Sequence, residues 1–382
     1  MPDREPNAYE EIIAAAPKGS KKYWTEIPDD YQSMVLSSLR ARIAGCNLGA
    51  IVEGWSLEKM ENYAKEIGVP YPMTDYWPSS PDPEEPRYIL GRNRQYTKGE
   101  MRYSPVDDDT TYTILGLLIA EEAKNFPFAL EDVANAWLKY LPMACTAEKV
   151  TLDNLKAGVA PEKAAEINNP YDEWIGADIR CDGFAYMAPG NPRLAAKLAY
   201  TDAYLSHRKN GIYGEMYFAA VISSAFALKD PKAALEAGLF EIPENCDLAE
   251  AIKWALSLYG KVKDYREAAK LVDERFPEMS PVHTINNACL TIFALGLGHE
   301  TKSIDTVISQ CVAMAHDCDC TAATAGSIAG AAWGNATLSE HWYKPFNDIQ
   351  ESYLIGRRVF GIEDLSFRFA AQARRHLALI YS

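Results

Sequence analysis

Two groups of aspartates hold the residue types best suited to chemistry in this sequence. Asp107, Asp108 and Asp109 stand together directly before the apolar run 112–119. Adjacent carboxylates repel one another, so a fold retains them where a helix N-terminus or a cation offsets their charge. Taken alone, this motif is more typical of an ordinary helix start with a capping aspartate and an acidic first turn than of a metal site.

The second group favours a metal site over that simpler interpretation. Asp317 and Asp319 precede residues 321–334, which are almost all small. A helix of small residues lets neighbouring backbones approach closely, as a buried central helix would. Two carboxylates at the mouth of such a helix, facing a second acidic helix start, would form an all-oxygen site for Mg²⁺ or Mn²⁺.

Helical periodicity dominates the elements that must position these aspartates. Apolar residues recur three and four apart in six clear segments. Asp247 and Asp305 are placed to cap two of these helices, and Pro127 and Pro142 to end two others. Period-2 alternation is scarce, so few strands are expected and the fold class is predicted to be all-α. The six segments are residues 111–124, 130–140, 192–207, 213–228, 247–259 and 305–314.

Two long stretches interrupt the helices. Residues 67–106 include a Pro-rich segment, and residues 168–193 form the second stretch. Both exceed the usual loop length, and long ordered loops are often functional. Both contain Trp and Tyr that would pack against a core, so neither is expected to be an interdomain linker. We therefore predict one compact multi-helix domain over residues 1–382, with two large loops.

Composition limits the classes of protein to which the chain can belong. The 382 residues carry 38 Lys and Arg against 53 Asp and Glu, a formal net charge of −15. This acidic balance argues against binding to nucleic acid, because no basic stripe could neutralise a row of phosphates. A hydrophobic content of 48% is ample for a packed core.

The same reasoning predicts the compartment. The first residues lack the apolar segment of a secretory signal, and no run of about 18 apolar residues predicts a membrane span. The eight cysteines show no zinc-type spacing. Cys145, Cys289 and Cys311 are expected to be buried helical thiols. We expect a reduced, cytoplasmic protein with no membrane partner; the sequence gives no indication of its oligomeric state.

Three motifs in order resemble the ADP-ribosylglycohydrolase family, which includes the dinitrogenase reductase-activating glycohydrolases. The pattern G-D-x-L-G-x-x-x-E is similar to residues 45–53, Ser/Thr-Asp-Asp-Thr to residues 107–110, and Asp-x-Asp-Ser/Thr before a Gly/Ala-rich helix to residues 317–320. The resemblance spans roughly residues 40–335. It implies a single all-α domain with a central small-residue helix, two bound Mg²⁺ ions (Mn²⁺ being possible), and hydrolysis at the anomeric carbon of a ribose.

The resemblance also implies roles for individual residues. The metal ligands would be Asp107, Asp108, Asp109, Asp317 and Asp319. Asp317 or Asp319 would take the proton from water, as catalytic groups. Glu53 would ligate metal or act in acid/base catalysis, whereas outside the motif it would be an ordinary surface carboxylate.

A loop of the family that lines the ribose and phosphate pocket is similar to residues 176–190, and a Thr-His pair to Ser206 and His207. Trp55 could stack on a substrate base or simply pack in the core. Arg180 could read a phosphate or form an ion pair. His207 could contact substrate or a helix C-terminus. The substrate-binding set implied in this way is Glu53, Trp55, Asp178, Arg180, Asp182, Gly183 and His207.

Three positions depart from the family pattern. Cys46 replaces the aspartate of the first motif, Asp107 replaces the first Ser/Thr ligand, and Cys320 replaces the last one. A thiol is a poor ligand for hard Mg²⁺, so we expect that Cys320 does not coordinate the ion and that Asp107 compensates in charge. The departures suggest a divergent subfamily with a different ribosyl substrate.

Three functional classes follow from the resemblance. The first is hydrolysis of ADP-ribose from a protein or small molecule, and the second is hydrolysis of small N- or O-ribosyl compounds such as nucleosides. The third is a non-catalytic relative, since the family includes lens crystallins. The five aspartates argue against the third class, but both hydrolytic classes share the reacting ribose, so the sequence does not separate them.

Overall fold

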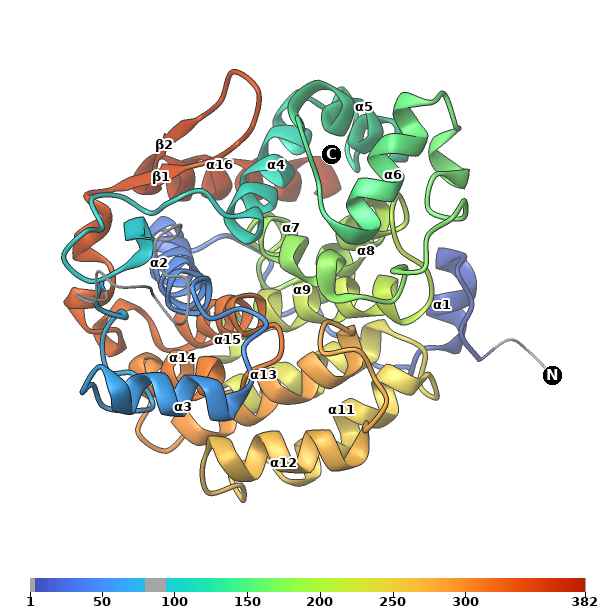
Figure 1. Ribbon diagram of the computed structural model, residues 1–382. Coiled ribbons are helices and arrows are strands. Elements are labelled where there is room, and N and C mark those ends of the chain that lie inside the picture. Colours follow the sequence, from blue (N-terminus) through green and yellow to red (C-terminus); the bar gives the residue numbers. More distant parts are fainter. Residues whose placement is uncertain (1–3, 80–93, 382) are drawn as a thin grey trace.

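Helices form nearly all the regular structure of the computed structural model, which describes residues 4–79 and 94–381 (Figure 1). The described residues contain only two strands, which pair antiparallel with Gln350 opposite Phe360. The all-α prediction is confirmed. The α-helices are α1 (Tyr9–Ala15), α2 (Tyr31–Gly49), α3 (Leu57–Glu66), α4 (Asp108–Glu122), α5 (Leu130–Tyr140), α6 (Thr146–Lys156), α7 (Cys181–Tyr186), α8 (Pro192–Ala203), α9 (Asn210–Leu228), α10 (Pro231–Gly238), α11 (Asp247–Ser257), α12 (Tyr265–Arg275), α13 (Thr284–Gly298), α14 (Ile304–Ala313), α15 (Cys318–Trp333) and α16 (Ile362–Tyr381). The 3₁₀ helices and strands are η2 (Arg94–Tyr96), η3 (Pro161–Lys163), η4 (Ile175–Arg180), η5 (Leu239–Glu241), η6 (Asn335–Thr337), η7 (Glu340–Trp342), η8 (Lys344–Phe346), β1 (Ile349–Glu351) and β2 (Val359–Gly361).

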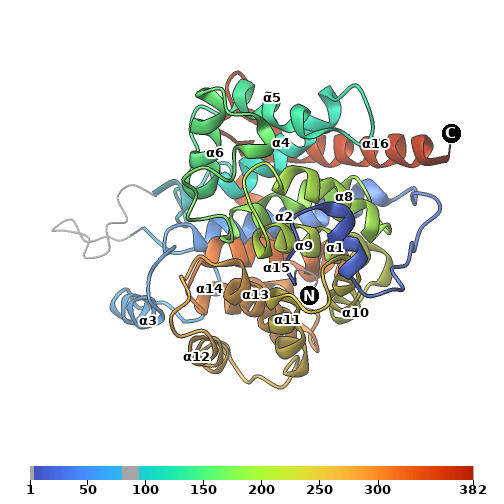
Figure 2. The same ribbon diagram turned by 90° about the vertical axis from the view of Figure 1, so that its right-hand side faces the viewer.

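Helices α2 and α15 pack together through the middle of the molecule (Figure 2). Residues 318–332 of α15 are all buried, as expected for a central helix of small residues. A Cβ atom built on Gly45 would lie 2.2 Å from the Ala322 carbonyl oxygen, and one built on Gly326 would lie 2.5 Å from that of Ala41. The backbones therefore touch at these positions, which only glycine permits.

Helix α9 is a second buried core helix. Residues 210–226 of this helix are all buried, and α8 and α10 pack against it. By length and composition α9 is the one helix within the described residues that could cross a membrane, but 89% of its apolar window is buried inside the protein. Its hydrophobicity is therefore explained by its place in the core.

The two long stretches differ in how they pack. Tyr76 and Trp77, from the first stretch, are buried, and the Tyr76 hydroxyl donates a hydrogen bond to the Trp342 carbonyl at 2.6 Å. Residues 80–93 of this Pro-rich stretch lie outside the described residues. The second stretch, 168–193, is not a loop throughout, because it contains η4 and α7. Each is only six residues long, too short to repeat an apolar pattern over several turns.

Three local expectations were wrong. Helix α11 is capped by the Cys246 sulfur, which accepts from the Ala249 N–H, and not by Asp247. Helix α14 is capped by Ser303 in place of Asp305. Cys145 is exposed at the N-cap of α6, although all eight cysteines are free and Cys289 and Cys311 are buried as expected.

Substitution of Gly45 tests the contact between α2 and α15. The Gly45→Ala variant places a methyl group against the Ala322 carbonyl, so the helices must separate, and the free energy of unfolding should fall by roughly 3 kcal/mol. Gly361→Ala is the control, because its nearest neighbour is the movable Asp348 carboxylate. Denaturant unfolding measures both variants. Equal stability of the two would show that the helices do not touch as described.

Candidate active site

The ends of several helices meet around a cavity of about 430 Å³, a size typical of small-molecule sites. Its walls come from the turn after α2, the N-termini of α4, α6 and α15, the η4 segment and the chain near β1. Both predicted aspartate motifs reach this cavity. Six carboxylates line it, namely Glu53, Asp107, Asp108, Glu148, Asp317 and Asp319.

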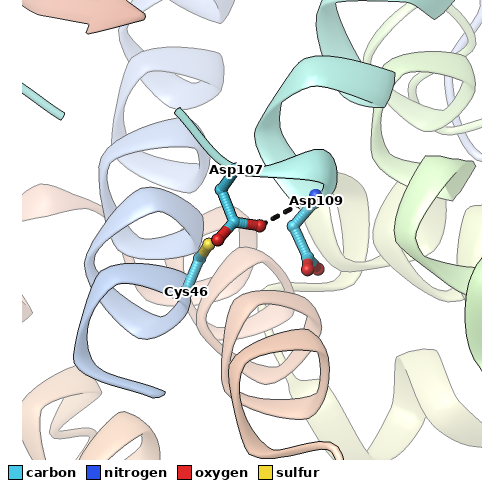
Figure 3. Close-up of side chains that lie close together, drawn as sticks. All are labelled: Cys46, Asp107 and Asp109. Atoms are coloured by element: carbon cyan, nitrogen blue, oxygen red, sulfur yellow. Dashed lines mark hydrogen bonds between the residues drawn. The ribbon is translucent and has the colours of Figure 1, made fainter. Parts of the chain in front are cut away.

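Helix N-termini position most of these acids. Asp107 is the N-cap residue of α4, and its carboxylate accepts a hydrogen bond from the Asp109 N–H at 3.0 Å (Figure 3). Asp317 is the N-cap residue of α15, and Asp319 lies in the first turn of that helix. The positive end of each helix dipole offsets part of the negative charge. The aspartates that start the helices can therefore also line the cavity as carboxylates.

Three overlapping groups of side chains could hold metal ions. Cys46, Asp107 and Asp109 form one group, in which the possible ligand atoms all lie within 4.8 Å of one another. Asp109 also belongs to a group with Asp319 and Cys320. The third group joins Asp319 and Asp317 to Glu53. The structure thus brings together residues from α2, α4 and α15 that the sequence separates widely.

Burial and mutual repulsion raise the pKa values of these carboxyl groups. The pKa of Asp107 is raised to about 8, mainly by burial and then by Asp108. Burial raises the pKa values of Asp109 and Asp319 well above their usual range. One carboxylate oxygen of Asp109, of Asp317 and of Asp319 is buried without a hydrogen-bond partner. Orphaned carboxylate oxygens are the donor set that Mg²⁺ and Mn²⁺ prefer, so the residues fit a hard divalent ion.

Arg42 lies beside the cluster and is a residue that the sequence did not reveal. It is fully buried on α2, with Nη1 2.7 Å from a carboxylate oxygen of Asp182 and Nη2 3.7 Å from Oδ1 of Asp109. It also donates to the main-chain oxygens of Asp109 and Ile179. This guanidinium offsets part of the negative charge behind the cavity. The only sequence signal is an arginine within a helix of small and apolar residues.

Cys46 and Cys320, two of the positions that depart from the motif patterns, lie against the carboxylates. Cys320 Sγ lies 3.3 Å from Oδ2 of Asp109 and donates a hydrogen bond to it. Cys46 lies beside Asp107, as Figure 3 shows. Burial and the neighbouring aspartates raise the pKa values of both thiols well above their usual range. In this protein both groups therefore keep their protons.

Glu53, the last residue of the first motif, lines the cavity from the turn after α2. Its side chain is exposed, but the walls partly desolvate its carboxyl group. This desolvation, together with the charges of Asp317 and Asp108, raises the pKa of Glu53 to about 7. Trp55, two residues further on, does not line the cavity and packs edge-on against Tyr63.

The remaining residues expected to bind substrate lie behind the cavity wall. The buried Arg180 guanidinium is engaged by Glu148 at 2.6 Å, by Glu215 at 3.5 Å and by Asp202. It is therefore committed to an internal ion-pair network and not free to read a phosphate. His207 is fully buried as well, with Nδ1 2.8 Å from the Ser206 hydroxyl.

Three further residues of the 176–190 segment have packing contacts. Asp178 accepts a hydrogen bond from the Thr284 hydroxyl at 2.6 Å. Asp182 is paired with Arg42. A Cβ atom on Gly183 would lie 3.0 Å from the Thr113 carbonyl oxygen. None of the three lines the cavity, but they anchor the segment whose residues Gly176 and Ile179 do.

Another part of the lining is formed by residues that no motif indicated. Glu148, from the first turn of α6, is buried and accepts hydrogen bonds from Arg180 at 2.6 Å and from the Thr146 hydroxyl at 3.3 Å. Trp174 and Tyr353 add aromatic surface. These residues come from short helices and turns far apart in the chain, so only the folded structure brings them to one cavity.

Comparison with known proteins is consistent with this geometry. A family model described as ADP-ribosylglycohydrolase matches residues 27–369, most of the chain. Among solved structures, an "ADP-ribosylglycohydrolase-related protein complex" has a TM-score of 0.57 and 16% sequence identity, covering 91% of this chain and 100% of that one. At this identity the similarity is one of fold. No curated protein matches the sequence significantly.

A double substitution tests whether the two aspartate motifs form one metal site. Asp108→Asn with Asp317→Asn removes a charge from each motif, so Mg²⁺ and Mn²⁺ affinity measured by calorimetry should fall at least about 100-fold. Asp153→Asn with Asp364→Asn, two exposed positions, is the control. Unchanged affinity in the first variant would exclude a shared site.

Proposed function

This chain belongs to the ADP-ribosylglycohydrolase family, whose activity is hydrolytic, and on that premise we propose that it is a metal-dependent hydrolase of ribosyl glycosidic bonds. The observation that carries the proposal is the convergence of carboxylates from α4 and α15 on one cavity, with buried oxygens that lack partners. A protein without catalytic function would gain nothing from this arrangement, because buried like charges destabilise a fold.

The proposed ligands are Asp107, Asp108, Asp109, Asp317 and Asp319, which would hold one or two Mg²⁺ or Mn²⁺ ions. Such ions would supply Lewis-acid polarisation and a fixed point of attachment for ribose hydroxyls. The Cys320 thiol, which donates to Asp109, would hold that ligand carboxylate in place, and Cys46 would do the same for Asp107.

The reaction needs side chains in three roles, namely a base for the water, negative charges that stabilise the sugar cation, and an acid for the leaving group. Asp317 or Asp319 would accept one proton of the attacking water, whose oxygen bonds to the anomeric carbon. The bond to the aglycone breaks and its electron pair leaves with the aglycone, while nearby carboxylates stabilise the positive charge that develops on the sugar. Glu53, which lies beside Asp317 in the cavity lining, would deliver a proton to the leaving group.

Two substrate classes are compatible with this chemistry. The first class, ADP-ribosylated proteins or small molecules, is the one that family membership suggests. Phosphate-free ribosyl compounds are the second candidate, and a specific observation favours them, namely the charge of the cavity lining. A reduced, cytoplasmic setting is part of the proposal and is consistent with eight free cysteines.

Removal of divalent ions tests the metal dependence. Treatment with a chelator should abolish hydrolysis, and addition of Mg²⁺ or Mn²⁺ should restore it, because the carboxylates alone cannot polarise the ribose. The measurement is the release of free sugar from a ribosyl substrate. Full activity in the chelated protein, with ion removal verified by elemental analysis, would contradict the proposal.

The role of Glu53 in acid/base catalysis is tested separately. Glu53→Gln keeps the shape of the side chain but cannot transfer the proton, so kcat should fall by roughly 10²–10⁴. Ion affinity, measured in parallel, should change much less. The control is Glu58→Gln on the exposed face of α3. A Glu53→Gln variant with unaltered kcat would rule out this role.

A further inference from the structure

The cavity is unusually rich in negative charge. Six carboxylates line it, and among the described residues that form its walls there is no lysine, arginine or histidine. Two divalent ions would offset four of these charges and Arg180 pairs with Glu148, so the lining would carry no net positive charge. A ligand that carries phosphates inside the cavity would meet repulsion with no cationic side chain to offset it.

α-Helix N-termini also commonly bind phosphate, and those of the three α-helices that reach the cavity carry carboxylates of their own. The N-termini of α4, α6 and α15 all reach the cavity. Helix α4 begins with the aspartates 107–109, and α15 begins with Asp317 and Asp319. Helix α6 carries Glu148 in its first turn. The partial positive charge that would attract a phosphate is already neutralised at each of the three positions.

The rest of the lining is apolar and aromatic. Trp174, Ile175, Val282 and Tyr353 contribute to it. Surfaces of this kind bind flat, weakly polar groups, with specificity supplied by a few polar side chains. The apolar part of the cavity therefore suits an aromatic aglycone better than a pyrophosphate.

Glu148, from the first turn of α6, is the one carboxylate of the described lining that belongs neither to the aspartate motifs nor to the turn after α2. It is buried, and Arg180 and the Thr146 hydroxyl fix its orientation from behind. Burial raises the pKa of Glu148 to about 7, and the charge of Arg180 opposes that effect. The ion pair with Arg180 favours the ionised form, which only accepts hydrogen bonds, so this residue would select a ligand that presents N–H donors.

We propose that the cavity takes a phosphate-free nucleoside, with its ribose at the aspartate cluster and the N–H or amino edge of its base on Glu148. This inference rests on the proposed function and names its substrate class. In the reaction, the oxygen of water bonds to the anomeric carbon and the C–N bond breaks with its electron pair going to the base. One proton of the water ends on the base nitrogen, which gives free ribose and free base.

Ranking of substrates on the unmodified protein is the first test and requires no variant. With Mg²⁺ present, kcat/KM for adenosine, cytidine or inosine should exceed that for an ADP-ribosyl-arginine peptide by at least about 100-fold, because only the second substrate carries phosphates into the acidic cavity. An ADP-ribosylated peptide cleaved as efficiently as the best nucleoside would overturn the inference.

The second test concerns Glu148. Glu148→Gln should reduce kcat/KM for adenosine by roughly 5- to 150-fold, whereas purine riboside, which lacks the amino group, should lose much less. Glu131→Gln, on the exposed surface of α5, is the matched control. A change in the ratio of kcat/KM for adenosine to kcat/KM for purine riboside reports recognition of the base. An equal loss of kcat/KM for both substrates would overturn this role. Thermal unfolding establishes that the variant is folded.

Binding measurements separate a failure of this inference from a failure of the proposed function. Calorimetry on the unmodified protein with Mg²⁺ compares adenosine with ADP-ribose. If nucleosides bind and ADP-ribose does not, yet nothing is hydrolysed, the proposed hydrolytic function fails while the choice of ligand stands. If ADP-ribose conjugates are cleaved, the proposed function stands and the inference fails. No nucleoside binding up to millimolar concentration would also overturn the inference.

Discussion

The direct backbone contact between α2 and α15 is the constraint on which the rest of the structure depends. Glycines on both helices make it possible, and an added Cβ on Gly49 would lie only 2.5 Å from Cα of Asp319. Because this contact extends to the mouth of the site, it fixes where the N-terminus of α15 lies relative to the turn after α2. The positions of Asp317, Asp319 and Glu53 therefore follow from the packing of two helices and not from a flexible loop.

This packing brings several carboxylates close together, and their negative charges destabilise the fold. Burial raises the pKa values of these carboxyl groups and repulsion between them adds to the rise, as Asp107 and Asp109 show. Three features offset that cost within the chain. Helix N-termini supply partial positive charge, Arg42 pairs with Asp182 beside Asp109, and the Cys320 thiol donates to Asp109. The oxygens that still lack partners are those we propose to bind divalent ions.

A similar division of charge explains why Arg180 does not face the ligand. Its guanidinium forms ion pairs with Glu148, Asp202 and Glu215, so its positive charge is balanced by these acids and not by a ligand. Glu148 is the member of this network that reaches the cavity. Arg180 therefore holds Glu148 in position and leaves no arginine in the described cavity lining to bind a phosphate. This is the basis for expecting a phosphate-free ligand.

Much of the fold and part of the site could be predicted from the sequence. Long helices were found because apolar residues repeat over several turns, and the two aspartate motifs stood out because adjacent carboxylates are costly without a compensating partner. The short elements η4 and α7 were missed because six residues cannot establish a period. Arg42 and Glu148 were missed because nothing in their local sequence shows which distant residues they will meet. The prediction of the helix cap was wrong at α11, where a cysteine sulfur caps the helix in place of the expected aspartate.

Anomalous X-ray scattering from crystals soaked in Mn²⁺ tests most directly whether this helix contact builds a metal site. We expect one or two strong peaks between the N-termini of α4 and α15, within coordination distance of carboxylate oxygens from both aspartate motifs. A well-ordered crystal with no peak at that position, or with Mn²⁺ bound only elsewhere on the protein, would contradict the central claim.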